Sequence, residues 1–274
     1  RNPVHFDELP GEKKKLTEVQ QEIADDFIRS YDAGDRTPVL LHGITGSGKT
    51  EVYMEMIDAM LQRGKQCIVL IPEIALTYQT LLRFYKRFGD AVSVMHSRLS
   101  AGERYDQMKR AKRGEVQVMI GPRSALFTPF QKLGLIIIDE EHETSYKSDS
   151  MPKYHAREVA VHLAEMTDAC VVMGSATPSL EANYRAQQGI YKKYVLSERI
   201  GDAVLPEVQI VDMRQELAGG NSSIFSRHLE TAIADRLEKR QQVMLFLNRL
   251  GISGFVSCRA CGYVMKCPHC DVSL

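Results

Sequence analysis

The feature that most constrains the fold of this chain is a series of short apolar runs that alternate with helix-forming segments. Six runs are predicted as strands: 38–43, 66–72, 91–96, 116–121, 133–139 and 169–175. Their centres are continuously apolar, which is typical of strands that are buried on both faces. The sequence therefore predicts an α/β fold in which helices cover both faces of a parallel sheet.

The intervening segments carry helix signals. Four helices are predicted, within 13–35, 49–64, 75–89 and 100–114. In the first, Leu16, Val19, Ile23 and Phe27 repeat at helical spacing. A glycine follows the last apolar residue of each of the other three, which is a common way for a helix to end.

Beyond about residue 190 turn-forming residues become frequent, and this change predicts a domain junction. A helix at 226–240 and a strand at 242–248 are expected after it. We therefore expect one domain at 1–190, the first part of a second at 191–257 and a cysteine-rich module at 258–274.

The stretch GITGSGKT matches the phosphate-binding pattern G-x-x-x-x-G-K-[ST] at every fixed position. It follows a predicted strand and begins a predicted helix, which is the context that the pattern requires. Glycines let main-chain N–H groups turn toward phosphates, and the helix N-terminus adds partial positive charge. A glycine-rich turn without a ligand is the alternative. The residues predicted to bind a nucleotide and Mg²⁺ are Gly43, Ile44, Thr45, Gly46, Ser47, Gly48, Lys49 and Thr50.

The strand that ends at Asp139 is followed at once by Glu140, Glu141 and His142. Ligands of open α/β sheets bind at the carboxyl ends of strands, so Asp139 is predicted to share a Mg²⁺ ion with the Thr50 hydroxyl. Glu140 would polarise the attacking water. The alternative is a polar loop, which the phosphate loop disfavours. His142 is either a solvated loop residue or a partner of the elements that sense the γ-phosphate.

Four of the six cysteines lie close together near the end of the chain: Cys258, Cys261, Cys267 and Cys270. Two Cys-x₂-Cys pairs suit tetrahedral Zn²⁺ and indicate a reducing compartment, not a disulfide framework. A single Zn²⁺ site that uses all four cysteines is one alternative, although the five residues between the two pairs are few for such a site. Four free thiols are the other alternative.

Composition excludes some classes of protein. Basic and acidic residues both number 35, so no global basic field attracts nucleic acid, and any nucleic-acid surface must be local. No apolar run reaches the roughly 18–20 residues of a membrane span, and no signal peptide begins the chain. Because the first residue is Arg1 and not Met, we expect a piece of a longer protein.

The motifs GSGKT, DEEH and GSATPS occur in the order found in superfamily-two helicases. The blocks PEIALT, GPRSALFTPF, YHARE and FLNRLG, followed by the cysteine pairs, resemble those of the DExH-type replication-restart helicases of bacterial primosomes. This resemblance implies a RecA-like lobe, part of a second RecA-like lobe and the start of a zinc-binding insertion. It also implies ATP-driven 3′–5′ translocation on DNA at stalled replication forks.

The resemblance assigns roles to individual residues. The catalytic residues would be Lys49, Asp139 and Glu140, and the residues that couple hydrolysis to lobe movement would be His142, Ser175 and Thr177. Gln20 would read the adenine of ATP, but the same glutamine could form a helix capping box with Thr17, and the sequence leaves both readings open.

The family also has an aromatic-rich loop that senses single-stranded DNA and reports to the ATP site. The residues that fit this role are Tyr146, Lys147, Lys153, Tyr154 and Arg157, with flat rings for bases and cations for phosphates. A solvated loop with two incidental tyrosines is the alternative.

The resemblance further implies two Zn²⁺ sites, each only half present here, because their other cysteines would lie beyond Leu274. Cys258 and Cys261 would pair with the last two cysteines of the family, and Cys267 and Cys270 with the middle two. The implied partners are single-stranded and forked DNA, other primosome proteins and single-strand-binding protein, in the bacterial cytoplasm and without a membrane. The family's preceding DNA-binding domains and later motifs are missing, so we expect weak ATPase activity and no unwinding from this chain alone.

Other functional classes fit less well. A nucleotide-dependent module that docks primosome partners through its cysteines is the main alternative to a motor. The stretch LAGGN at 217–221 faintly resembles a transporter ATPase signature, but it follows the carboxylate motif instead of preceding it. The N-K-x-D motif of GTPases is absent from the sequence.

Overall fold

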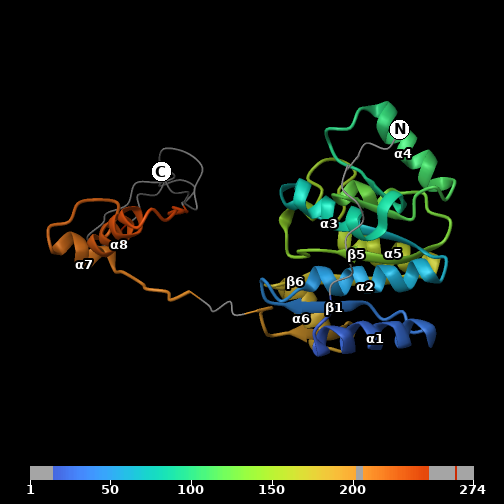
Figure 1. The fold of residues 1–274 in the computed structure, drawn as a ribbon, viewed down its shortest axis with the longest axis horizontal. Coiled ribbons are helices and arrows are strands. Elements are labelled where there is room, and N and C mark those ends of the chain that lie inside the picture. The colour runs from blue at the N-terminus through green and yellow to red at the C-terminus, as the bar shows by residue number, and fades with distance from the viewer. Residues whose placement is uncertain (1–14, 202–205, 247–262, 264–274) are drawn as a thin grey trace. The chain divides into compact units, whose positions relative to one another are not determined.

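The computed structural model describes residues 15–201, 206–246 and 263. Contacts within the chain divide it into two compact units, Arg1–Val204 and Leu205–Leu274, both drawn in Figure 1. The first unit contains a seven-stranded sheet, and each unit is described by itself.

Seven strands of the first unit form one sheet in the order β3-β4-β2-β5-β6-β1-β7, and every neighbouring pair is parallel. The strands are β1 (Val39–Gly43), β2 (Gln66–Leu70), β3 (Val92–Val94), β4 (Val118–Gly121), β5 (Leu133–Ile138), β6 (Cys170–Ser175) and β7 (Lys192–Leu196). All carboxyl ends therefore meet at one edge, where the motifs of the sequence are brought together.

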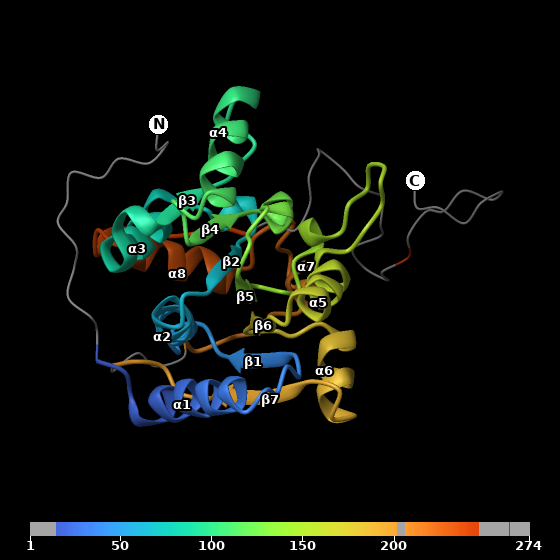
Figure 2. The same ribbon diagram turned by 90° about the vertical axis from the view of Figure 1, so that its right-hand side faces the viewer.

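Helices cover both faces of this sheet, with α1, α2 and α3 on one side and α5 and α6 on the other (Figure 2). The helices of this unit are α1 (Glu18–Asp32), α2 (Lys49–Gln62), α3 (Tyr78–Phe88), α4 (Ala101–Lys112), α5 (Ala156–Thr167) and α6 (Leu180–Gln187). The α/β fold expected from the sequence is confirmed.

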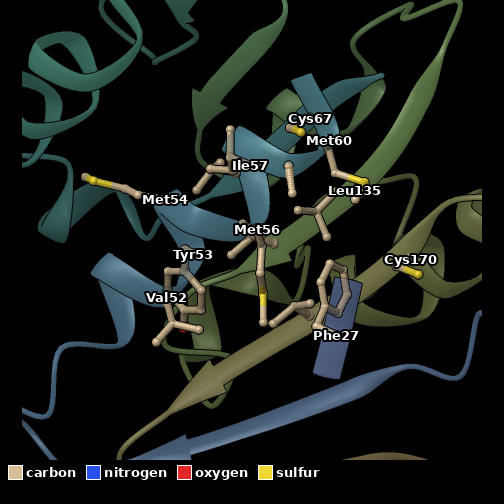
Figure 3. Packing of buried hydrophobic residues seen from close by; sticks show 14 of the residues in the cluster. Phe27, Val52, Tyr53, Met54, Met56, Ile57, Met60, Cys67, Leu135 and Cys170 are labelled. Atoms are coloured by element: carbon tan, nitrogen blue, oxygen red, sulfur yellow. The ribbon is translucent and has the colours of Figure 1, made fainter. Parts of the chain in front are cut away.

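The core consists of two apolar clusters, one on each face. Successive strand residues point to opposite faces, so Leu41 joins the cluster under α1 and α2, while Leu40 joins the cluster under α5. Figure 3 shows the first cluster, in which Phe27 of α1 and Met56 of α2 pack near Leu135 of β5. Burial on both faces explains why these strands are continuously apolar.

The six predicted strands and four predicted helices of this unit are all present, with ends a few residues inside the expected ranges. Two α-helices and one strand of this unit were not predicted: α5, α6 and β7. The expected domain boundary near residue 190 is also too early. Strand β7 pairs with β1 from Val39↔Lys192 to Gly43↔Leu196, and the first compact unit extends to Val204.

The described part of the second unit contains two helices, α7 (Met213–Ala218) and α8 (Arg227–Glu238). The helix α8 confirms the prediction for 226–240. The strand predicted for 242–248 is not formed in its described part, 242–246, where the chain has no regular secondary structure.

Candidate functional site

The glycine-rich stretch forms a closed loop between β1 and α2. Gly46 and Gly48 have φ angles of +84° and +81°, a region that glycine enters without strain. Lys49 folds back over the loop, and its Nζ donates a 2.8 Å hydrogen bond to the Gly43 carbonyl oxygen. A side chain at Gly43 would come within 2.6 Å of Ser47 Oγ and 2.9 Å of Lys49 Cγ. The loop can therefore close around the lysine only because glycine occupies this position.

The carboxylates after β5 face this loop. Asp139 and Glu140 line one cavity of about 410 Å³ together with the loop residues Ile44, Thr45, Gly46, Gly48, Lys49 and Thr50. Glu140 Oε1 lies 3.9 Å from Lys49 Nζ. Parallel strands thus bring together two segments that are about 90 residues apart in the sequence.

The backbone and the charges of the carboxylate segment are both unusual. Glu140 has a φ of +48°, a left-handed conformation that costs a residue with a side chain of the order of 1 kcal/mol. Burial, followed by the charge of Glu140, raises the pKa of Asp139 to about 6, whereas the Lys49 ammonium acts in the opposite direction. A cation held by Asp139 would offset the same repulsion. The oxygen donors of Asp139 and Thr50 are the type that Mg²⁺ prefers, so the residues fit this ion.

Gln20 connects the first helix to the loop. Its Oε1 accepts a 3.0 Å hydrogen bond from Thr17 N, and Thr17 Oγ1 accepts one of 3.3 Å from Gln20 N, so the capping box is present. Its Nε2 donates to the Ser47 carbonyl oxygen at 2.8 Å. The side chain is 2 % exposed and lines the loop cavity. Gln20 can therefore form the capping box and lie beside the phosphate loop at the same time. Its role in recognising adenine stays a prediction.

The motif residues His142, Ser175 and Thr177 form a short chain of hydrogen bonds. His142 Nδ1 and Ser175 Oγ are 2.7 Å apart, and the same hydroxyl accepts a 3.0 Å bond from Thr177 N. His142 Nδ1 also lies 3.7 Å from Glu140 Oε2. The histidine therefore connects the carboxylate loop to the end of β6, and the solvated alternative for His142 is wrong.

Arg157 does not face solvent, and its predicted place in a DNA-sensing loop is wrong. Its NH1 lies 3.1 Å from Glu141 Oε2, and the two side chains are 7 % and 0 % exposed. The Glu141 carboxylate also accepts hydrogen bonds from Ser179 N (2.6 Å) and Ser179 Oγ (3.0 Å). A buried carboxylate needs such partners because leaving it unpaired would be very costly. The arginine is therefore committed to holding the motif segments together.

Tyr146 also departs from the prediction. Its ring is 1 % exposed, and its hydroxyl donates to the Asp139 carbonyl oxygen at 2.6 Å and to the Leu70 carbonyl oxygen at 3.1 Å. A buried tyrosine hydroxyl usually finds an acceptor, and the ends of β2 and β5 supply acceptors here. Tyr146 is therefore an internal support of the Asp139 segment and cannot stack on a base in this conformation.

Tyr154 and Lys147 remain at the surface of the loop. Tyr154 is half-buried and packs edge to face against Phe127, with ring centroids 5.5 Å apart. Phe127 is 55 % exposed, and Lys147 is exposed as well. The sequence analysis did not single out Phe127, which follows β4 and lies far from the loop in sequence.

A second cavity of about 400 Å³ lies at the carboxyl ends of β2, β3 and β4. Arg104 and Arg123 line it, together with His96 and Glu73. Arg123 NH1 donates to the Ser145 and Lys147 carbonyl oxygens at 2.8 and 2.9 Å, so this side chain also fixes the aromatic loop.

A scan against protein families matches residues 17–185 to the DEAD/DEAH box helicase family. The chain belongs to the DEAD/DEAH box helicases. Membership implies the use of ATP and Mg²⁺, for which the loop cavity offers the expected groups.

Two relatives of this helicase chain carry the same name, replication restart protein PriA. It is 51 % identical to the replication restart protein PriA of Bacillus subtilis over 94 % of the chain and 32 % of that relative. It is 54 % identical to PriA of a Synechocystis species over 86 % of the chain and 29 % of that relative. The chain thus spans about a third of the length of these relatives.

Among solved structures, RecG bound to a three-way DNA junction is 22 % identical and superposes with a TM-score of 0.51 over 69 % of this chain and 25 % of that one. This likeness concerns the fold alone, and it confirms the RecA-like helicase architecture of the first unit.

The zinc prediction falls outside the described residues, because Cys258, Cys261, Cys267 and Cys270 are not among them. Within the part of the helicase chain that the structure describes, no group of three or more histidine, cysteine, aspartate or glutamate side chains that could hold a metal ion occurs. None of the described helices has both the length and the apolar character needed to cross a membrane.

The buried ion pair between Arg157 and Glu141 gives a first prediction. Replacing Arg157 with Ala should lower the free energy of unfolding by about 3–5 kcal/mol, since it leaves Glu141 charged and buried without its partner. Arg29→Ala is the control, because Arg29 forms a surface pair with Asp26 at 3.2 Å and is 71 % exposed. That change should cost at most about 1 kcal/mol. Urea denaturation of both variants measures the difference, and a loss below about 1 kcal/mol for Arg157→Ala would contradict this account of the pair.

Proposed function

We propose that the protein is an ATP-dependent 3′–5′ DNA helicase or translocase that acts in replication restart at stalled forks. The observation that carries the proposal is the single cavity in which the Lys49 loop meets Asp139 and Glu140. The names of the relatives supply the replication-restart context. The 3′–5′ direction of movement follows the family resemblance. In this proposal the first unit is the first helicase lobe.

The loop cavity suits phosphoryl transfer to water. Main-chain N–H groups of the loop and the Lys49 ammonium would hold the β- and γ-phosphates, with Thr50 and Asp139 as the protein ligands of Mg²⁺. A bound Mg²⁺ would neutralise charge that develops on the phosphates. The Glu140 carboxylate lies 3.9 Å from Lys49 Nζ and 3.7 Å from His142 Nδ1, a place from which it would orient the attacking water.

The His142–Ser175 contact supports a route from hydrolysis to movement. The histidine reaches Glu140 on one side and Ser175 on the other. A change at the γ-phosphate that shifts Glu140 would therefore reach the segment after β6, where Ser175 and Thr177 lie. We assign the coupling role of these three motif residues on this ground.

The DNA-facing surface would be the carboxyl edge beside the second cavity. Arg104 and Arg123 provide cations for phosphates, and the Phe127–Tyr154 pair provides exposed aromatic surface for bases. Arg123 binds the aromatic loop directly, so a backbone phosphate that draws this side chain away would release the loop.

The place of Tyr154 at the surface of the aromatic loop gives a second prediction. Tyr154→Ala should preserve basal ATP hydrolysis and weaken its stimulation by single-stranded DNA, since a stacked base contributes about 1–3 kcal/mol. This range corresponds to roughly 5- to 150-fold. Tyr184→Ala, which removes a 60 % exposed ring from α6, should leave both rates unchanged. Steady-state hydrolysis with and without oligonucleotide measures both.

Tyr146→Ala should behave differently from Tyr154→Ala. Removing a buried aromatic ring costs about 3–5 kcal/mol of stability, and here it also removes the hydroxyl that supports the Asp139 segment. A Tyr154→Ala protein that is stimulated like wild type would contradict the DNA-facing role of the aromatic pair.

The finer parts of the proposal follow the family resemblance. They comprise a second RecA-like lobe that begins in the second unit, two zinc sites completed by cysteines outside this chain, and primosome proteins, single-strand-binding protein and forked DNA as partners. Bacterial cytoplasm is the proposed location.

The direct test is ATP hydrolysis and strand separation by the full-length protein on forked DNA. A motor hydrolyses ATP faster with single-stranded DNA and separates strands only with ATP. A nucleotide-dependent binding module, the second candidate, would bind partners through its cysteines without needing Lys49. Absence of DNA-stimulated hydrolysis would overturn the motor.

A further inference from the structure

Tyr53 is a buried tyrosine whose hydroxyl group meets the carboxylate of Asp139. It lies one helical turn after Lys49 on α2, and its side chain is 1 % exposed. Figure 3 shows the ring among the packed residues of this helix, next to Val52 and Met56. The hydroxyl donates a 3.1 Å hydrogen bond to Asp139 Oδ1. The helix that begins at the phosphate loop therefore contacts the carboxylate segment directly.

Packing fixes the hydroxyl in this position. A side chain at Gly174 on β6 would overlap the Tyr53 hydroxyl and the ring carbon that carries it. The absence of a side chain at Gly174 thus makes room for the phenol at the end of β6, adjacent to β5. A tyrosine side chain has only two rotatable angles, and both are restricted here by the surrounding core.

The main chain of Asp139 is held independently. Its N–H donates to the Leu70 carbonyl oxygen at 2.9 Å, and its carbonyl oxygen accepts from the Tyr146 hydroxyl at 2.6 Å. With the backbone fixed by these contacts, rotation of the side chain is the remaining freedom of this carboxylate. The Tyr53 hydrogen bond restricts that rotation.

We propose that Tyr53 is a positioning residue that orients the Asp139 carboxylate for the nucleotide-bound cation. The proposal rests on the proposed function, which makes Asp139 a Mg²⁺ ligand. Removing an outer partner that orients a metal ligand typically lowers metal affinity by about 10- to 100-fold. Phenylalanine would fill the same space in the core, so the hydroxyl itself is what this position adds.

Another tyrosine of the same core shows that packing alone does not demand such a contact. Tyr31 on α1 is 6 % exposed and belongs to the same apolar cluster. Its hydroxyl is buried and has no hydrogen-bond partner among the described residues. A buried phenol is therefore tolerated in this core without an acceptor, and Tyr31→Phe is a matched control for Tyr53→Phe.

The test measures binding of a fluorescent ATP analogue to the full-length protein, with increasing Mg²⁺ and with the metal removed by EDTA. Tyr53→Phe should raise the Mg²⁺ concentration needed for half-maximal binding by about 10- to 100-fold. Affinity for the analogue in EDTA should stay within about twofold, because the Tyr53 hydroxyl is bonded to Asp139 and acts on the metal ligand. Tyr31→Phe should change neither quantity.

Asp139→Asn separates positioning from a general structural effect. In that background Tyr53→Phe should have no further effect on the Mg²⁺ dependence, since the group that it orients is already lost. A further loss of the same size in the double variant would mean a structural role for Tyr53. This result would overturn the proposal, as would wild-type Mg²⁺ dependence of Tyr53→Phe. A wild-type protein that binds no nucleotide would instead contradict the proposed function.

Discussion

Replacing Lys49 with Ala should abolish DNA-stimulated ATP hydrolysis in the full-length protein, with a loss of at least about 100-fold. Lys49 is 9 % exposed, its ammonium group is held by the Gly43 carbonyl oxygen, and it lines the same cavity as Asp139 and Glu140. The loop has no second cation that could replace Lys49, because its other residues are uncharged. Malachite-green detection of released phosphate, with and without single-stranded DNA, measures the effect.

Lys65→Ala is a suitable control, because this lysine precedes β2 and lies at the opposite, amino end of the strands. It should hydrolyse ATP at the wild-type rate. The Lys49 variant should retain the fold, as judged by its circular dichroism spectrum. Turnover of Lys49→Ala at the wild-type rate would remove the basis for assigning the loop to ATP.

Glu140→Gln should separate binding from hydrolysis. The amide keeps the shape of the side chain and removes the charge that orients water, so hydrolysis should fall by about 10²- to 10⁴-fold. Nucleotide affinity with Mg²⁺ should be unchanged or higher, because burial and then the Glu140 charge raise the pKa of Asp139. Removing that charge lowers the pKa and favours the ionised form that binds a cation.

Glu143→Gln is the matched control, since Glu143 lies one short turn further along the same segment and does not line the loop cavity. Isothermal titration with a slowly hydrolysed ATP analogue gives the affinities. A loss of affinity in Glu140→Gln as severe as in Lys49→Ala would mean that Glu140 shapes the pocket and has no role in orienting water.

The sequence predicted best those parts of the site that depend on local patterns. The phosphate loop needs only its glycines and its place between a strand and a helix, and both are visible in 43–50. Asp139 could be placed because parallel strands share one carboxyl edge, which follows from their continuous apolar character. Both predictions use rules that do not require knowledge of distant contacts.

The elements that were not predicted lack those patterns. Strand β7 lies at the edge of the sheet, and its burial alternates so that Lys193 and Val195 are exposed. Helix α5 packs through Ala156, Ala160 and Ala164, small residues that make no strong apolar stripe. An edge strand and an alanine-faced helix therefore give weak signals even though both are well formed.

The two corrected site residues depend on tertiary contacts. Arg157 has a long side chain that can reach solvent or the interior, and the position of Glu141 decides between them. Tyr146 turns inward because two carbonyl oxygens at strand ends accept its hydroxyl group. Composition shows a cation and an aromatic ring in a loop but does not show which way each one points.

The central claim is that residues 43–50 and Asp139 form one nucleotide–metal site. A crystal structure of the full-length protein with Mg²⁺ and a slowly hydrolysed ATP analogue tests it most directly. The account predicts that Lys49 Nζ leaves the Gly43 carbonyl oxygen for the β- and γ-phosphates, and that the Thr50 hydroxyl and Asp139 both face the Mg²⁺ ion. A nucleotide bound away from this loop, or a cation that approaches neither Thr50 nor Asp139, would contradict the claim.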